Sequence, residues 1–148
     1  MNNEERAFSI LEKAVSKAQE SLEKTKNFQP FAMILKCDGS IKLLENQIID
    51  AIESYSDIEK RVKELANCTD IDVLTMAVDT SIPENFAKST PQSIRLHVEE
   101  KCRVENKIGA RYIYVPYELY QSKKEQNLQV KLQAPIAVGF PAEYVVGS

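Results

Sequence analysis

Two short apolar segments, 31–35 and 41–44, are joined by Asp38 and Gly39. The first is an unbroken apolar run, long enough for a strand and too short for most helices. Asp-Gly is the strongest short-range hairpin signal, because both residues tolerate the backbone conformations of a tight turn. Pro30 has no backbone N–H to donate, so strand pairing begins after it. The sequence therefore predicts a β-hairpin, and the other segments are interpreted as elements that pack on its sheet.

Two amphipathic helices are predicted, over residues 3–26 and 46–66. In each segment the apolar residues recur at spacings of three and four, which places them on one helical stripe. The stripe of the first helix is Phe8, Leu11, Val15, Ala18 and Leu22. Asn3 suits the N-cap position of the first helix, and Asn67 follows the second helix as a stop signal. Each helix is expected to lay its apolar stripe on the sheet.

Further strands are predicted after the second helix, over residues 71–78, 93–102 and 110–117. The first of them is apolar at nearly every position, which is typical of a strand buried on both faces. The other two alternate apolar and polar residues, as strands with one buried face do. Loops are expected over 80–92 and 120–127.

Prolines divide the tail, residues 121–148, into short apolar pieces. Residues 128–132 alternate and predict a sixth strand, and 136–138 and 144–146 could each add an edge strand. The whole chain, 1–148, is thus predicted to be a single α+β domain. Its two helices pack on a mostly antiparallel sheet of five or more strands.

The predicted core takes residues from both helices and from four strands. It comprises Phe8, Leu11, Phe31, Met33, Leu35, Ile58, Val62, Leu74, Met76, Ile94, Leu96, Ile113 and Val115. Truncation of Leu96 or Ile113 to Ala is expected to cost about 2–5 kcal/mol of stability where the side chain is buried.

Composition and charge exclude several classes of protein. A chain of 148 residues has the length of one domain. Its net charge of -3 argues against non-specific nucleic-acid binding, which needs a basic surface. No apolar run approaches the ~20 residues of a membrane span, and the first residues lack the features of a signal peptide. The three cysteines are widely spaced, without a Cys-x-x-Cys pair, so a cytoplasmic protein is expected.

Patterns typical of catalysis or cofactor binding are missing from the sequence. The single histidine, His97, lies five residues from Cys102 on one predicted strand, about 15 Å away and on the opposite face, so the two cannot form a nucleophilic pair. His97 and Glu99 share a face, but two ligands do not make a zinc site. The four glycines are scattered, which argues against a phosphate-binding loop. We therefore expect no enzyme, no metal and no cofactor.

Tyrosines are concentrated in the segment 112–120, which holds four of the six. If the strands 93–102 and 110–117 form an antiparallel pair, the polar side chains of the first share a face with two of these tyrosines. Tyr and Arg are enriched where binding energy concentrates, so this face is a candidate partner-binding surface. Its residues are Arg95, His97, Glu99, Tyr112 and Tyr114. The alternative is that a helix of the same chain covers this face, with Arg95 and Glu99 paired at its margin.

Four short motifs resemble a group of small bacterial proteins of unassigned function. They are Phe28-x-Pro-Phe-Ala, Asp38-Gly39, the strand from Ser93 to Glu100, and Tyr114-Val115-Pro116-Tyr117, and the resemblance spans about residues 7–120. The order of elements is also similar to that of the roadblock and profilin-like sandwiches. This resemblance implies an α+β fold and the role of an interaction scaffold, and it implies no particular site.

The predicted function is that of a non-enzymatic cytoplasmic interaction protein that acts through a face or an edge of its sheet. The expected partner is another protein or a second copy, because apolar pieces in the tail leave a strand edge to be covered and predict a homodimer. Nucleic acid and membrane are not expected partners. Two alternatives stay open: a toxin-neutralising immunity protein, and a small-molecule-binding protein or enzyme with a pocket between helix and sheet.

Overall fold

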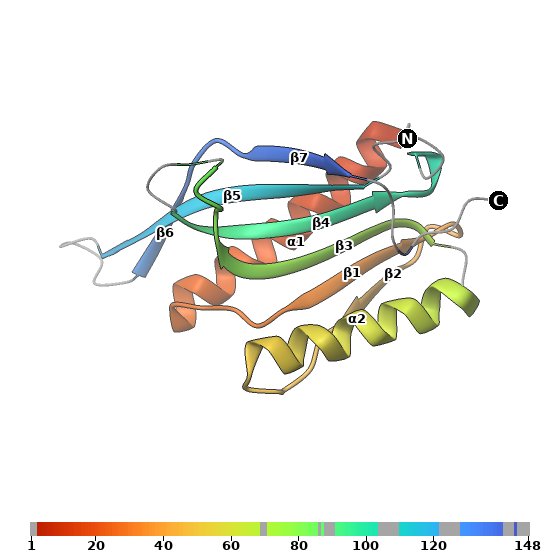
Figure 1. Cartoon of the computed structure of the whole chain (residues 1–148), viewed down its shortest axis with the longest axis horizontal. Coiled ribbons are helices and arrows are strands. Elements are labelled where there is room, and N and C mark those ends of the chain that lie inside the picture. The colour runs from red at the N-terminus through yellow and green to blue at the C-terminus, as the bar shows by residue number, and fades with distance from the viewer. Residues whose placement is uncertain are drawn as a thin grey trace.

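The computed structural model describes residues 3–68, 71–85, 87, 91–103, 110–121, 128–140 and 144. In chain order its elements are α1 (Asn3–Thr25), β1 (Phe31–Lys36), β2 (Ile41–Leu44), α2 (Ala51–Cys68), β3 (Ile71–Ser81), β4 (Gln92–Glu100), the 3-10 helix η1 (Lys101–Arg103), β5 (Ala110–Gln121), β6 (Leu128–Leu132) and β7 (Ile136–Phe140). Within these ranges the strands form one seven-stranded sheet in the order β2-β1-β3-β4-β5-β6, with β7 paired to the first half of β5 (Figure 1). All of the described pairings are antiparallel.

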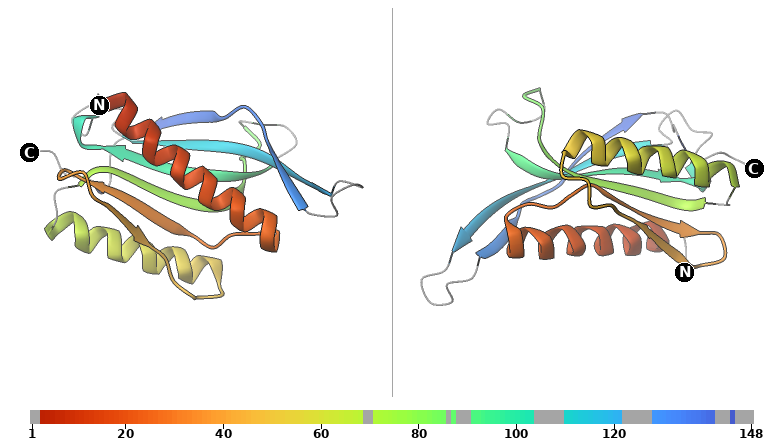
Figure 2. Two further views of the ribbon diagram at one scale, coloured as in Figure 1. Left: turned by 180° about the vertical axis from the view of Figure 1, so that it is seen from behind. Right: turned by 90° about the horizontal axis from the view of Figure 1, so that it is seen from below.

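The two helices cover opposite faces of the sheet (Figure 2). On the side of α1 the core includes Phe31, Ala77 and Ile94. On the side of α2 it includes Ile34 and Leu74. Alternate residues of a central strand therefore enter different cores, which explains why β3 is apolar along most of its length. The predicted α+β class, with two helices on a mostly antiparallel sheet of five or more strands, is confirmed.

The hairpin predicted from the Asp-Gly pair is formed by β1 and β2. Its loop has three residues, because the Gly39 N–H donates to the Lys36 carbonyl at 2.9 Å and the Lys36 N–H donates to the Ser40 carbonyl at 2.8 Å. Gly39 has a φ of +92°, a conformation that disfavours residues with a Cβ. The Asp38 carboxylate accepts hydrogen bonds from the Ser40 hydroxyl and backbone N–H, which lowers the pKa of Asp38.

The buried stripe of α1 differs from the predicted one by about one residue. Its buried side chains are Ala7, Ile10, Ala14, Ala18 and Leu22. Phe8, predicted to be in the core, is 61% exposed, and Leu11 and Val15 are only partly buried. Both stripes satisfy the same helical period, but the small alanines let the helix approach the sheet closely. The prediction for Phe8 is therefore wrong. It placed the stripe through the larger side chain, whereas the buried stripe begins one residue earlier, at Ala7.

The second helix begins at Ala51 and not at Asn46 as predicted. Asp50 is its N-cap, since the Asp50 carboxylate accepts the Glu53 N–H at 3.0 Å. Asn46 lies in the preceding loop, where its side-chain oxygen accepts the Ser54 hydroxyl at 2.7 Å and its amide donates to the Ser54 carbonyl at 3.1 Å. A polar residue that resembles a cap in the sequence thus ties the loop to the first turns of the helix.

The later strands occur where predicted, with different ends. β3 continues to Ser81, whereas β4 stops at Glu100 and is followed by η1, which contains Cys102. β5 runs through Pro116 to Gln121, so the loop predicted to begin at residue 120 begins later. The loop residues 122–127 lie outside the described part of the chain.

Two of the predicted tail strands are confirmed as β6 and β7, which pair with the second and first halves of β5. Of the third predicted strand, 144–146, only Tyr144 is described, and it lies in a bend. The remaining residues of that prediction lie outside the described part of the chain. The tail therefore completes the far edge of the sheet.

The Tyr117 hydroxyl donates a hydrogen bond of 2.8 Å to the Asp79 carboxylate, which joins β5 to β3. Burial, and then the Asp79 carboxylate, raise the pKa of Tyr117 above its usual value. Because the pKa is higher in the folded than in the unfolded state, this contribution to stability is present below about pH 10 and is lost as the pH rises through the folded-state pKa.

We expect the free energy of unfolding of the natural protein to fall more steeply above about pH 10 than that of Tyr117→Phe, which has no phenol to ionise. Urea denaturation of both proteins at a series of alkaline pH values checks this. Parallel pH profiles for the two proteins would contradict the assignment.

Candidate binding site

The structure brings the five predicted partner-binding residues together on the α2 side of the sheet. In the register of β4 and β5, Arg95 lies opposite Tyr114 and His97 lies opposite Tyr112, while Glu99 lies one pleat further along β4. The predicted sharing of a face is therefore confirmed. The five residues nevertheless divide into two halves with different surroundings, and the exposed surface expected from the sequence exists only in part.

The half around His97 and Glu99 is closed, with exposed fractions of 1% and 0%. The His97 Nε2 atom lies 2.6 Å from a Glu99 carboxylate oxygen, and the other Glu99 oxygen accepts the Tyr144 backbone N–H at 2.9 Å. The Tyr144 ring lies 5.3 Å from the His97 ring, and its hydroxyl donates to Glu59 of α2. The expectation of exposure is wrong for His97 and Glu99, because Tyr144 from the tail covers them.

The half around Arg95 is more open. The Arg95 guanidinium lies 4.5 Å from the centre of the Tyr112 ring and 5.8 Å from that of Tyr55, which α2 contributes. Tyr114 beside them is buried, so the expectation of exposure is wrong for Tyr114 as well. Burial raises the pKa of Tyr114, although the charge of Arg95 and a hydrogen bond with Arg95 oppose the shift. Cation–π contacts of this kind stabilise a guanidinium without neutralising its charge. Among the described residues no carboxylate lies within ion-pairing distance of Arg95, and its Nε atom is buried without a hydrogen-bond partner.

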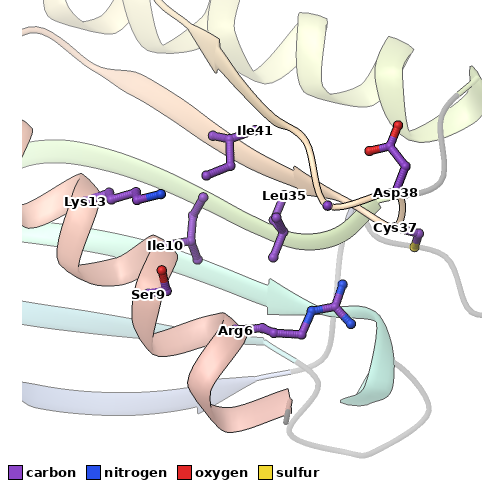
Figure 3. A pocket seen from close by; sticks show the side chains of 9 residues that line it. Arg6, Ser9, Ile10, Lys13, Leu35, Cys37, Asp38 and Ile41 are labelled. Atoms are coloured by element: carbon purple, nitrogen blue, oxygen red, sulfur yellow. The ribbon is translucent and has the colours of Figure 1, made fainter. Parts of the chain in front are cut away.

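A cavity of about 380 Å³ opens elsewhere, between α1 and the tip of the β1–β2 hairpin (Figure 3). Arg6 and Lys13 of α1 border it, and Ile41 of β2 forms part of the opposite wall. Arg6 forms an ion pair with Asp72, so this cationic group is already partnered. The lining also holds Lys13 and Asp38, so charges of both signs border this hollow.

Arg95 borders a cavity of about 370 Å³ between the first turns of α2 and the ends of β3 and β4. It is lined by Asn27, Phe28, Pro30, Ala51, Ile52, Tyr55, Val78, Asp79, Thr80 and Arg95. Two isoleucines at this end of α2 are nearly fully exposed, Ile52 in the cavity wall at 82% and Ile49 before the helix at 93%. The loop that carries Ile49 is held beside the cavity, because the Gln29 amide donates to the Ile48 carbonyl at 2.9 Å.

An apolar groove of about 540 Å³ runs along the flank of α1 on the opposite face of the sheet. Phe8 and Leu11 border it from the helix, Ile113 and Leu132 border it from the strands, and Pro135 borders it from the connection between β6 and β7. It offers apolar contact area without a buried cation. It therefore provides an exposed apolar surface with which the Arg95 region can be compared.

Three residues at this end of α2 were not predicted from the sequence as part of the candidate surface, namely Tyr55, Ile49 and Ile52. A usable signal was the excess of apolar residues at 48, 49 and 52, which is more than one helical stripe requires. Tyr144 carried no such signal, because it is distant in sequence from both elements that it contacts. Within the described ranges no three His, Cys, Asp or Glu side chains gather as metal ligands.

These features define an α+β domain with a two-faced core and an arginine-centred cavity. No family model, curated protein or solved structure matches the chain. In the described part of the chain, neither helix has the length and apolar character that crossing a membrane requires.

Proposed function

We propose that this chain is a non-enzymatic protein-binding domain that contacts its partner through the α2 surface, which we define as Ile49, Ile52, Tyr55, Arg95 and Tyr112. The observation that carries the proposal is the Arg95 guanidinium, held against two tyrosine rings beside a cavity whose wall includes the exposed Ile52, with the exposed Ile49 just before the same helix. Aromatic residues and arginine at the centre of a patch, with apolar side chains around them, are typical of binding hot spots.

The energetics of the rim support a protein partner. Ile49 and Ile52 leave most of their apolar surface in water, and burial of one such side chain contributes about 1.5–3 kcal/mol. The Tyr55 and Tyr112 rings hold the arginine, so little side-chain freedom remains to be lost on binding. A partner that covers this rim would bury apolar surface and an arginine together.

A pair of matched variants tests the α2 surface. Ile52→Asp places a charge on the rim, and Phe8→Asp places the same charge on the exposed apolar groove of the opposite face. With tagged protein as bait, we expect a partner to be retained by the natural chain and by Phe8→Asp, and to bind at least about tenfold more weakly to Ile52→Asp. Thermal unfolding of the three proteins checks that each one is folded.

The opposite pattern, loss of the partner with Phe8→Asp and retention with Ile52→Asp, would move the contact to the groove beside α1. If the partner is a second copy, light scattering should give about twice the monomer mass of 16.8 kDa. Ile52→Asp should then restore the monomer mass, whereas Phe8→Asp should leave the dimer intact.

A further inference from the structure

We propose that the Arg95 cavity binds a carboxylate, presented by an acidic side chain of the partner protein. This inference rests on the proposed function and specifies the chemistry of its central contact. The starting observation is a cation with a buried, unpartnered Nε and no carboxylate within ion-pairing distance among the described residues. Buried donors are normally hydrogen-bonded, so the guanidinium is incompletely satisfied, and its place in the lining of an open cavity gives an acceptor of the partner access to it.

The surroundings of Arg95 favour a planar acceptor. Tyr112 and Tyr55 lie at 4.5 Å and 5.8 Å from the guanidinium carbon, and their contacts limit the orientations of the group. A guanidinium presents a rigid fork of N–H donors that matches the two oxygens of a carboxylate. The rings thus hold the donor for bidentate pairing before any partner arrives.

The charge of the cavity favours a monoanion over a phosphate dianion. Among the described lining residues Arg95 is the one cationic side chain, whereas the Asp79 carboxylate points to the α1 side of the sheet, where it binds Tyr117. Asp79 is already engaged, because its carboxylate accepts hydrogen bonds from Tyr117 at 2.8 Å and from the Gln92 amide at 2.9 Å. A group with two negative charges would meet a single cation, whereas a carboxylate balances the arginine.

The walls of the cavity also specify what lies beside the acid. Phe28, Pro30, Val78 and Ile52 supply apolar surface around the single cation. A peptide segment with an acidic residue next to a branched apolar residue therefore fits this cavity. The acid pairs with the arginine, and the apolar side chain packs on the apolar walls. A free carboxylic acid shares the carboxylate but has no peptide backbone to cover the isoleucine rim.

The test uses two blocked peptides, acetyl-Leu-Glu-amide and acetyl-Leu-Gln-amide, titrated into the full chain and followed by NMR chemical shifts. We expect saturable shifts at the lining residues, with the glutamine peptide about tenfold weaker because it lacks the charge. Equal affinities for the two peptides would overturn the proposal. This comparison needs no variant, so it stays decisive even if a substitution at Arg95 impairs folding.

Variants then place the contact. Arg95→Gln should weaken the glutamate peptide about tenfold, and Arg95→Lys, which keeps the charge but not the fork, should be intermediate. Arg61→Gln is the control, because Arg61 lies on α2 outside the cavity lining and pairs with Asp57. Unchanged binding by Arg95→Gln, or an equal loss with Arg61→Gln, would contradict the assignment.

Two further results separate this inference from the proposed function. If a captured partner depends on Ile52 but Arg95→Gln retains it, the protein-binding function stands and the carboxylate contact is wrong. A third titration uses free 4-methylpentanoate, which has a branched chain and a carboxylate but no peptide. If this acid binds more tightly than the glutamate peptide, the cavity is a site for small acids and the partner side chain is overturned as its ligand.

Discussion

Leu74→Ala is expected to lower the free energy of unfolding by about 2–5 kcal/mol. Leu74 is fully buried in the core beneath α2, and in the sheet it lies between Ile34 of β1 and Glu99 of β4. Because strands flank it on both sides and a helix covers the face, the neighbouring groups cannot move far to fill the space. The loss therefore includes both the transfer of the missing methyl groups and the cavity they leave.

Leu43→Ala is the matched control for this prediction. It makes the same substitution on the edge strand β2, where the side chain is 40% exposed, and should cost about 1 kcal/mol or less. Urea denaturation followed by circular dichroism measures both, since the chain has no tryptophan to report by fluorescence. Equal losses in the two variants would show that Leu74 does not lie in a closed core.

The strands were predictable because their apolar residues recur at every second position. This spacing assigns each side chain to one face of the sheet. Ile94, Leu96 and Val98 alternate with polar neighbours, and the structure buries all three on the α1 side. The hairpin was predictable for a different reason, since the Gly39 position requires a backbone conformation that few other residues adopt. Local sequence patterns were therefore enough to predict these elements.

The phase of α1 was not predictable from periodicity alone. Stripes through Ala7 and through Phe8 have the same period, and hydrophobicity favours the larger residue. The structure selects Ala7 and leaves Phe8 beside an apolar groove, because close contact with the sheet requires small side chains. The face of the sheet that each helix covers was not predictable either. It depends on the connections between elements, and the apolar pattern within one segment carries no information about those connections.

The sequence predicted which residues of β4 and β5 share a face, and it did not predict which other segments cover that face or add residues to it. Strand register alone places Arg95 beside Tyr114 and His97 beside Tyr112. Tyr144 covers the half around His97 and Glu99, and Tyr55 with the start of α2 forms one wall of the cavity beside Arg95. Those contacts join segments that are distant in sequence, so no local spacing reports them.

Glu99→Leu is expected to lower the free energy of unfolding by about 3–5 kcal/mol, because it removes the partner of two buried polar groups, each worth about 1–3 kcal/mol. The substitution leaves His97 without the carboxylate that lies 2.6 Å from its Nε2 atom. It also removes the acceptor of the Tyr144 backbone N–H, so the tail residue that covers this half loses a contact. Urea denaturation by circular dichroism measures the loss, and a change below about 1 kcal/mol would contradict a buried pair of this kind.

A double-mutant cycle separates the pair from the general effect of substitution at these positions. His97→Leu alone leaves the Glu99 carboxylate in the core without its histidine partner. The double variant His97→Leu with Glu99→Leu removes both polar side chains of the pair. Replacement of both partners by apolar residues is often close to neutral, so the double variant should be more stable than the sum of the single losses predicts. The remaining deficit of the double variant then reports the Tyr144 contact, since its N–H still lacks the carboxylate. Additive losses from the two single substitutions would mean that His97 and Glu99 stabilise the fold independently and that the 2.6 Å contact contributes nothing of its own.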